Sequence, residues 1–108
     1  MDLYAELLQK KSQLEATIKM LRQSGTDYAE AERAYKFLLR TKCLELREEG
    51  MAIGMIDKTC YGIPEVADLR FKRDVARTVY KANLEAINSI KLQLRLIKAQ
   101  LDREYRAS

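Results

Sequence analysis

Four basic side chains follow one another at helical spacing in the second half of the chain. Arg70, Arg73, Arg77 and Lys81 are separated by three, four and four residues, which places them on one face of an α-helix. Arginine presents a planar fork of N–H donors that matches the oxygens of a phosphate group. The spacing therefore predicts a basic stripe suited to a phosphate-bearing ligand.

Aromatic residues lie close to this stripe in the sequence. Tyr80 falls within it, and we expect a glycine-rich segment to carry Lys58 and Tyr61 over the first turns of the same helix. Because an aromatic face can stack on a nucleobase, this combination favours a nucleotide or a nucleic acid as the ligand. The predicted ligand-binding residues are Lys58, Tyr61, Arg70, Arg73, Arg77, Tyr80 and Lys81.

A simpler interpretation leaves the charges of the stripe solvated or paired. Asp68 and Asp74 interleave with the arginines, and exposed ion pairs contribute little free energy. Arg73 is informative because the heptad pattern, extended toward the N-terminus, places it on the apolar seam, where it needs an anion from a ligand or a neighbouring subunit. Three interpretations stay open: a solvated or interface-pairing face, a discrete pocket for an anionic ligand, and an extended nucleic-acid surface.

The composition argues against catalysis. The 108 residues include 20 Lys and Arg and 16 Asp and Glu but no His, so the commonest general base and zinc ligand is missing. No dense acidic cluster offers the convergent oxygens of a Mg²⁺ site. Cys43 and Cys60 have neither a CxxC spacing nor a His partner, and we interpret them as free thiols, with Cys43 buried on a helix face. We therefore expect a non-enzymatic protein with no metal and no cofactor.

Helices must position these side chains, and the first half of the chain predicts two of them. Apolar residues recur at intervals of three and four along residues 4–21 and again along residues 28–46. Between these runs, Ser24-Gly25 is typical of a helix end and Thr26-Asp27 of a new start. Residues 1–49 are therefore predicted to form an antiparallel helical hairpin that stops at Gly50 in the left-handed conformation.

Residues 50–63 are predicted to form a glycine-rich connector with a turn and a short helix. A very long third helix then begins at Pro64, a residue favoured at the first helical position, and meets no further Gly or Pro through residue 108. Its second half keeps a heptad seam, formed by Tyr80, Asn83, Ile87, Ile90, Leu94, Ile97 and Leu101.

The length of this third helix predicts self-association. A helix that spans residues 64–108 cannot be covered by a hairpin of two helices half as long, so we expect its excess apolar surface to bind another subunit. A break near Asn83, or cover supplied by the connector, is the alternative. The expected fold is a single all-α domain, residues 1–108, in which residues 64–108 form the oligomerisation helix of a homo-oligomeric bundle.

The distribution of charge and the first residues of the chain indicate which partners and which cellular compartment to expect. Residues 64–108 carry ten basic and six acidic residues, whereas residues 1–63 carry ten of each, so the net charge of +4 belongs to the third helix. The first eleven residues, MDLYAELLQKK, include Asp2 and Glu6 and no long apolar run. No stretch reaches the roughly 18 apolar residues of a membrane span. We expect no secretory leader, no membrane contact and a cytoplasmic protein.

Three segments of the chain, LREEGM, VADLRFKRDVA and YKANLEAINSIKLQLRLIKAQLDREY, resemble small all-helical proteins from early gene regions of phages and prophages of Firmicutes. The resemblance covers residues 30–105. It implies a phage protein of the host bacterial cytoplasm, either an anti-defence protein of the Sequestin-like kind, which sequesters a nucleotide signal, or an accessory to phage replication or recombination.

The two roles use the stripe differently. In an anti-defence protein, Arg70, Arg73 and Arg77 would hold the phosphates of a cyclic dinucleotide or a ligand of the cyclic ADP-ribose type, and Tyr61 or Tyr80 would stack its base. In a replication accessory, the stripe would bind single-stranded DNA or a protein partner. A purely structural coiled-coil adaptor is the third interpretation.

Overall fold

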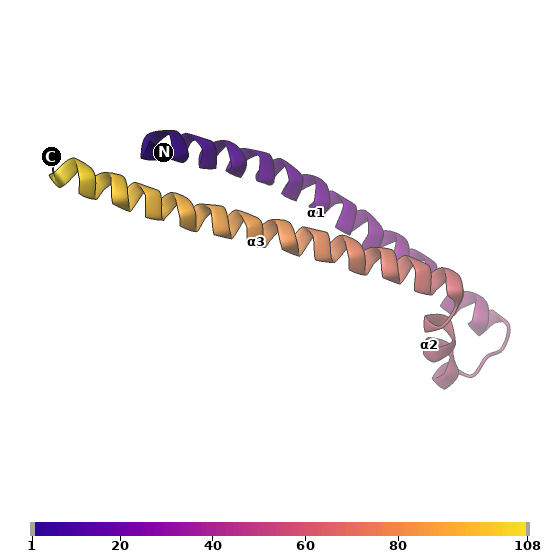
Figure 1. Cartoon of the computed structure of the whole chain (residues 1–108). Helices are drawn as coiled ribbons and strands as arrows, with labels where there is room; N and C mark the ends of the chain where they lie inside the picture. The colour runs from indigo at the N-terminus through magenta and orange to yellow at the C-terminus, as the bar shows by residue number, and fades with distance from the viewer. Residues whose placement is uncertain (1, 108) are drawn as a thin grey trace. The chain divides into compact units, whose positions relative to one another are not determined.

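The computed structural model describes residues 2–107 and consists of three α-helices, with no strand in that range. α1 spans Leu3–Glu48, α2 spans Ile53–Tyr61 and α3 spans Pro64–Ala107 (Figure 1). The predicted all-α class, the short helix in the connector and the long third helix that begins at Pro64 are confirmed. α3 runs through Asn83 without the break that was its alternative.

The helical hairpin predicted for residues 1–49 is wrong, because α1 is one continuous helix of 46 residues. Ser24 does not end the helix: its hydroxyl donates a 3.0 Å hydrogen bond to the Leu21 carbonyl, and its side chain is buried. The side-chain amide of Asn83 donates to the Ser24 hydroxyl at 2.9 Å and to the Met20 carbonyl at 3.3 Å. A glycine inside a helix costs only about 1 kcal/mol. We infer that the contacts of Met20 and Ser24 with α3 offset this cost, so that α1 continues through Gly25.

The end of α1 follows the prediction. Gly50 has a φ of 89°, in the left-handed region that favours glycine. Its N–H donates to the Arg47 carbonyl, and the Met51 N–H donates to the Leu46 carbonyl, both at 3.1 Å. This Schellman arrangement satisfies two carbonyls of the last helical turn and ends the helix.

The chain divides into two compact units. The first unit is formed by the chain up to Ser24 together with the chain from Tyr80 onward, and the second unit is Gly25–Val79. In the first unit, the beginning of α1 lies alongside the end of α3 (Figure 1). Its buried apolar side chains are Leu7, Ile87 and Ile97, and the Asn83 contacts with α1 add a polar layer.

α1 covers the heptad seam that was expected to bind another subunit. Ile87 and Ile97 are buried, and Ile90 and Leu94 are half-buried, within the first unit. Excess apolar surface on α3 was expected because two short helices could not cover it, whereas α1 is one helix of 46 residues. Self-association itself stays a prediction. Large apolar side chains of α3 that remain exposed include Phe71, Val75, Leu92 and Leu96.

The second unit packs α2 against the end of α1 and the beginning of α3. Its buried side chains are Tyr35, Ile56, Cys60 and Val66, of which Cys60 and Val66 are fully buried. Lys42 of α1 lies 3.4 Å from Glu45 and 3.6 Å from Glu65 of α3. These two carboxylates, Glu45 more than Glu65, raise the pKa of Lys42. The unit therefore combines a small apolar core with an ion pair between α1 and α3.

Candidate functional site

The first turns of α3 hold Arg70 against Tyr61, the last residue of α2. The guanidinium carbon of Arg70 lies 3.6 Å from the centroid of the Tyr61 ring, and Arg70 Nη1 donates a 2.9 Å hydrogen bond to the Tyr61 carbonyl. Carbonyls in the last turn of a helix have no partner within that helix, so this bond also caps α2. The other N–H groups of Arg70 donate to no residue in the range 2–107.

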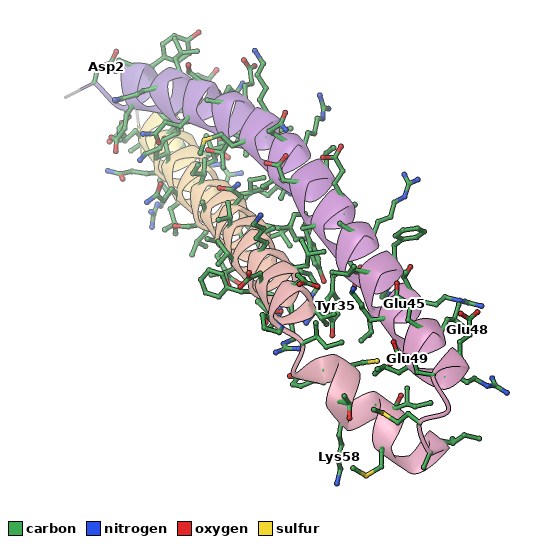
Figure 2. All side chains as sticks on the ribbon, turned by 90° about the vertical axis from the view of Figure 1, so that its right-hand side faces the viewer. Asp2, Tyr35, Glu45, Glu48, Glu49 and Lys58 are labelled. Carbon is green, nitrogen blue, oxygen red and sulfur yellow. The ribbon has the colours of Figure 1, made fainter. Side chains whose placement is uncertain are left out.

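Arg73 lies on the seam of α3, as predicted, and it is largely buried. Its guanidinium carbon is 4.5 Å from the centroid of the Tyr35 ring, and Figure 2 shows Tyr35 on the side of α1 that faces α3. Arg73 Nε and Nη2 lie 3.0 and 2.9 Å from Oδ1 of Asp74, and the side chain is 18% exposed. The anion that the seam arginine needs is thus Asp74 of its own helix. That a ligand or a neighbouring subunit supplies a further anion stays a prediction.

Asp74 also holds a second arginine. Arg77 Nη2 lies 2.6 Å from the same Oδ1 that contacts Arg73, so one carboxylate oxygen joins the two guanidinium groups. The side chains of Asp74 and Arg77 are 46% and 39% exposed, which leaves this pair open to solvent. Arg70, Arg73 and Arg77 carry three positive charges against the single negative charge of Asp74, so this face retains a formal charge of +2.

The structure brings four of the seven predicted residues into two pairs, Tyr61 with Arg70 and Arg73 with Arg77, and both pairs involve the first turns of α3. Lys58 is exposed on α2 and points away from Tyr35 (Figure 2). Tyr80 and Lys81 belong to the other unit, and their place in the predicted site stays a prediction. We call Tyr35, Tyr61, Arg70, Arg73, Asp74 and Arg77 the arginine cluster.

Sequence reasoning missed the roles of two members of the arginine cluster. Asp74 was interpreted as one of the acids that leave the stripe solvated or paired, without a named partner; it precedes Arg77 by three residues, a spacing that brings side chains together on a helix. Tyr35 belongs to the apolar pattern of residues 28–46, and it is buried. Nothing in the sequence indicates that its ring faces Arg73, because that contact depends on how α1 and α3 align within the second unit.

A second row of arginines lies on the exposed side of α1, in the same unit. Arg33, Arg40 and Arg47 follow one another at intervals of seven residues, with Phe37 and Leu44 between them. Phe37 is 74% exposed and Leu44 is 51% exposed. None of the three arginine side chains forms a hydrogen bond or an ion pair with another described residue. We call these five residues the α1 strip.

Net charge does not mark the α1 strip in the sequence. Residues 1–63 carry ten basic and ten acidic residues, so no excess marked this region. The signal was the seven-residue interval between the arginines, which is one heptad and keeps side chains on one helix face.

The two cysteines are free thiols in different environments. Cys60 is fully buried, whereas Cys43, the residue expected to be buried, is half-buried. Burial, together with a hydrogen bond to Cys43, raises the pKa of the Cys60 thiol to about 11. Cys60 is therefore protonated at neutral pH and is a poor nucleophile there. Within residues 2–107, no three His, Cys, Asp or Glu side chains come together as a metal site requires.

Comparisons of the chain with protein families, with curated proteins and with solved structures give no match. None of the helices in the described part of the chain is long and apolar enough to cross a membrane. The geometry of the arginine cluster and of the α1 strip is therefore the basis for a proposed function.

Proposed function

We propose that the protein is a non-enzymatic binding protein whose arginine cluster holds a phosphate-bearing nucleotide. One observation carries the proposal: Arg70 and Arg77 are each fixed by contacts within the chain and still keep N–H donors that no described residue uses. Five donors on a rigid fork exceed the single bond that each guanidinium makes here. The remaining donors suit the oxygens of a phosphate.

Fixation of the guanidinium groups favours a small ligand. Tyr61 holds Arg70 by ring contact and Asp74 holds Arg77 by an ion pair, so both side chains lose little conformational entropy when a ligand binds. Arg70 and Arg77 are seven residues apart, or about 10 Å along α3. A ligand that contacts both therefore needs two anionic groups, as a cyclic dinucleotide or a derivative of ADP-ribose has.

Tyr61 supports the nucleotide over a simple anion. Tyr61 is 54% exposed although Arg70 lies against its ring, so a nucleobase has access to this residue. Stacking on an aromatic ring contributes about 1–3 kcal/mol per base. A cation and an aromatic ring fixed side by side are the chemistry that recognises a phosphate and a base together.

The resemblance to phage anti-defence proteins suggests a biological role for such a site. In this role, the protein sequesters a nucleotide signal of the cyclic ADP-ribose or cyclic dinucleotide type. Sequestration needs no general base, in keeping with a chain that has no His. Association of several copies would multiply the number of sites per particle. The phage source, the role in defence and the homo-oligomer all stay predictions.

Calorimetry with the full chain tests the proposal. A panel of cyclic dinucleotides, cyclic ADP-ribose and a single-stranded oligonucleotide is titrated into the wild type, Arg70→Ala, and Arg95→Ala as a matched control on an exposed part of α3. We expect one nucleotide to bind, with an affinity about tenfold lower in Arg70→Ala, equal to about 1.4 kcal/mol, and unchanged in Arg95→Ala. Absence of nucleotide binding, or equal affinity of all three proteins, contradicts the proposal.

Salt dependence separates the nucleotide from the runner-up ligand, single-stranded DNA. A site for one or two phosphates releases few counterions, whereas extended DNA binding weakens by orders of magnitude between about 50 and 200 mM salt. Recovery of the intact nucleotide after incubation with Mg²⁺ and heat denaturation supports sequestration. Recovery of cleaved product contradicts the non-enzymatic assignment.

A further inference from the structure

The α1 strip has the spacing of a helix-binding seam. Arg33, Phe37, Arg40, Leu44 and Arg47 follow one another at intervals of four, three, four and three residues, which is the zigzag of a heptad seam. Its two apolar members are exposed to solvent. A second helix laid along α1 would meet an apolar side chain and a cation in alternation.

A hollow of about 220 Å³ lies at one end of the strip, between α1 and α2. It is lined by Cys43, Leu44, Arg47, Ile53, Ile56 and Asp57. Ile56 is buried, and Ile53 stands at the rim with 77% of its surface exposed. The hollow thus combines apolar side chains, which can receive an apolar anchor residue, with Arg47 of the strip and Asp57 of α2.

The arginine side chains of the strip form no ion pair with another described residue. Arg33, Arg40 and Arg47 have no ion pair among residues 2–107, although Lys36 on the same helix does pair with Glu32 at 3.6 Å. Glu30 and Glu32 lie within three residues of Arg33, and Glu45, Glu48 and Glu49 lie within two residues of Arg47. None of these acids forms an ion pair with an arginine of the strip. A complementary partner is therefore acidic as well as apolar.

We propose that the α1 strip is a docking surface for an acidic amphipathic helix of a partner protein. Carboxylates spaced by one heptad on that helix would pair with Arg33, Arg40 and Arg47. Apolar side chains between them would pack on Phe37 and Leu44, with one entering the hollow. This mode of recognition uses anchors at i, i+3 or i+4, and i+7 of the bound helix.

The apolar part of the surface favours a protein over a nucleic acid. Phosphates would pair with the arginines but would leave Leu44, Ile53 and the hollow without an apolar partner. A second copy of this chain is a poor match, because each copy carries a net charge of +4 and would bring further cations to the strip. The docking surface is independent of the arginine cluster, since it uses none of the cluster's residues.

The test uses the full chain and a designed fluorescent peptide of about 21 residues, three heptads with Leu and Glu at alternating seam positions. A scrambled peptide of the same composition is the control for charge alone. At about 150 mM salt, where distant charges are screened, fluorescence anisotropy should show binding of the designed peptide and at least about tenfold weaker binding of the scrambled one.

Variants locate the site. Arg40→Glu should weaken binding of the designed peptide by at least about tenfold and Leu44→Ser by about fivefold, while Arg95→Glu on α3 leaves it unchanged. Arg40 and Leu44 are exposed, so helix content measured by circular dichroism should match the wild type. Equal binding of the scrambled peptide, or equal affinity of Arg40→Glu and wild type, overturns the proposal. Tighter binding of an oligothymidine of about 20 nucleotides, lost in Arg40→Glu, would assign the strip to nucleic acid instead.

Discussion

The arginine cluster and the α1 strip place three arginines each on the same small unit, and the two sets differ in every contact. Arg73 is 18% exposed, faces an aromatic ring and shares Asp74 with Arg77. Arg40 on α1 is exposed, and its side chain forms no hydrogen bond, ion pair or ring contact with a described residue. Helical spacing is similar in both. The difference comes from the partners of the arginine cluster, namely one acid between the arginines in sequence and two tyrosines, which the α1 strip lacks.

This difference indicates two kinds of binding. Arginines that are already fixed present a preset pattern of donors, which suits a small ligand of defined shape. Arginines without partners adapt to a larger partner, and they gain their first ion pairs only when it arrives. The cluster therefore fits a nucleotide, and the strip fits an acidic helix.

The largest difference between the cluster and the strip is expected in how alanine variants of their arginines change the free energy of unfolding. Arg73→Ala removes a hydrogen-bonded ion pair and a contact with the Tyr35 ring, and should lower the free energy of unfolding by about 2 kcal/mol. Arg40→Ala removes no hydrogen bond or ion pair of the side chain and should change the free energy of unfolding by less than about 0.5 kcal/mol. Urea unfolding followed by circular dichroism measures both values. Equal losses in the two variants would mean that the cluster is no more fixed than the strip.

A second, smaller effect concerns the shared acid. Asp74→Asn keeps the shape of the side chain but removes the charge between Arg73 and Arg77, so stability should fall by about 1 kcal/mol. The same change raises the formal charge of the cluster from +2 to +3, so phosphate or nucleotide should bind several-fold more tightly. Calorimetry and urea unfolding of one sample measure both quantities. Weaker ligand binding in Asp74→Asn would show that the carboxylate contacts the ligand itself.

The smallest effect is a change in thiol reactivity. The raised pKa leaves Cys60 without reactive thiolate until the pH approaches about 11, so at pH 8 iodoacetamide should label the half-buried Cys43 much faster than Cys60. Labelling of Cys60 should increase as the pH rises. Because Cys60 precedes Tyr61, Arg70→Ala should loosen the end of α2 and speed this labelling about two- to threefold, as peptide mass spectrometry would detect. Arg40→Ala is the control that should leave the rate unchanged.

Local sequence signals predicted some elements and misplaced others for identifiable reasons. Gly50 and Pro64 act through their own backbone preferences, so the end of α1 and the start of α3 could be predicted. Ser24-Gly25 carries the same kind of signal, yet α1 continues there. The contacts from Asn83 that compete with it come from 59 positions further along the chain.

The arginine cluster, like the helix ends, could be predicted only in part. The heptad placed Arg73 on the seam correctly, but its partner is the adjacent Asp74 and its aromatic neighbour Tyr35 lies on another helix. The alignment of two helices decides such a contact, and side-chain spacing within one helix does not contain it. The α1 strip was visible in the sequence and was hidden only by a balanced charge count.

The mobility of the arginine side chains tests the central claim most directly. NMR relaxation of the Nε–Hε groups reports motion on the picosecond to nanosecond scale for each guanidinium, and single Arg→Lys variants assign the signals. We predict high order for Arg70, Arg73 and Arg77 and low order for Arg33, Arg40 and Arg47 in the free protein. Equal order parameters in the two sets would contradict the distinction between a fixed cluster and a free strip.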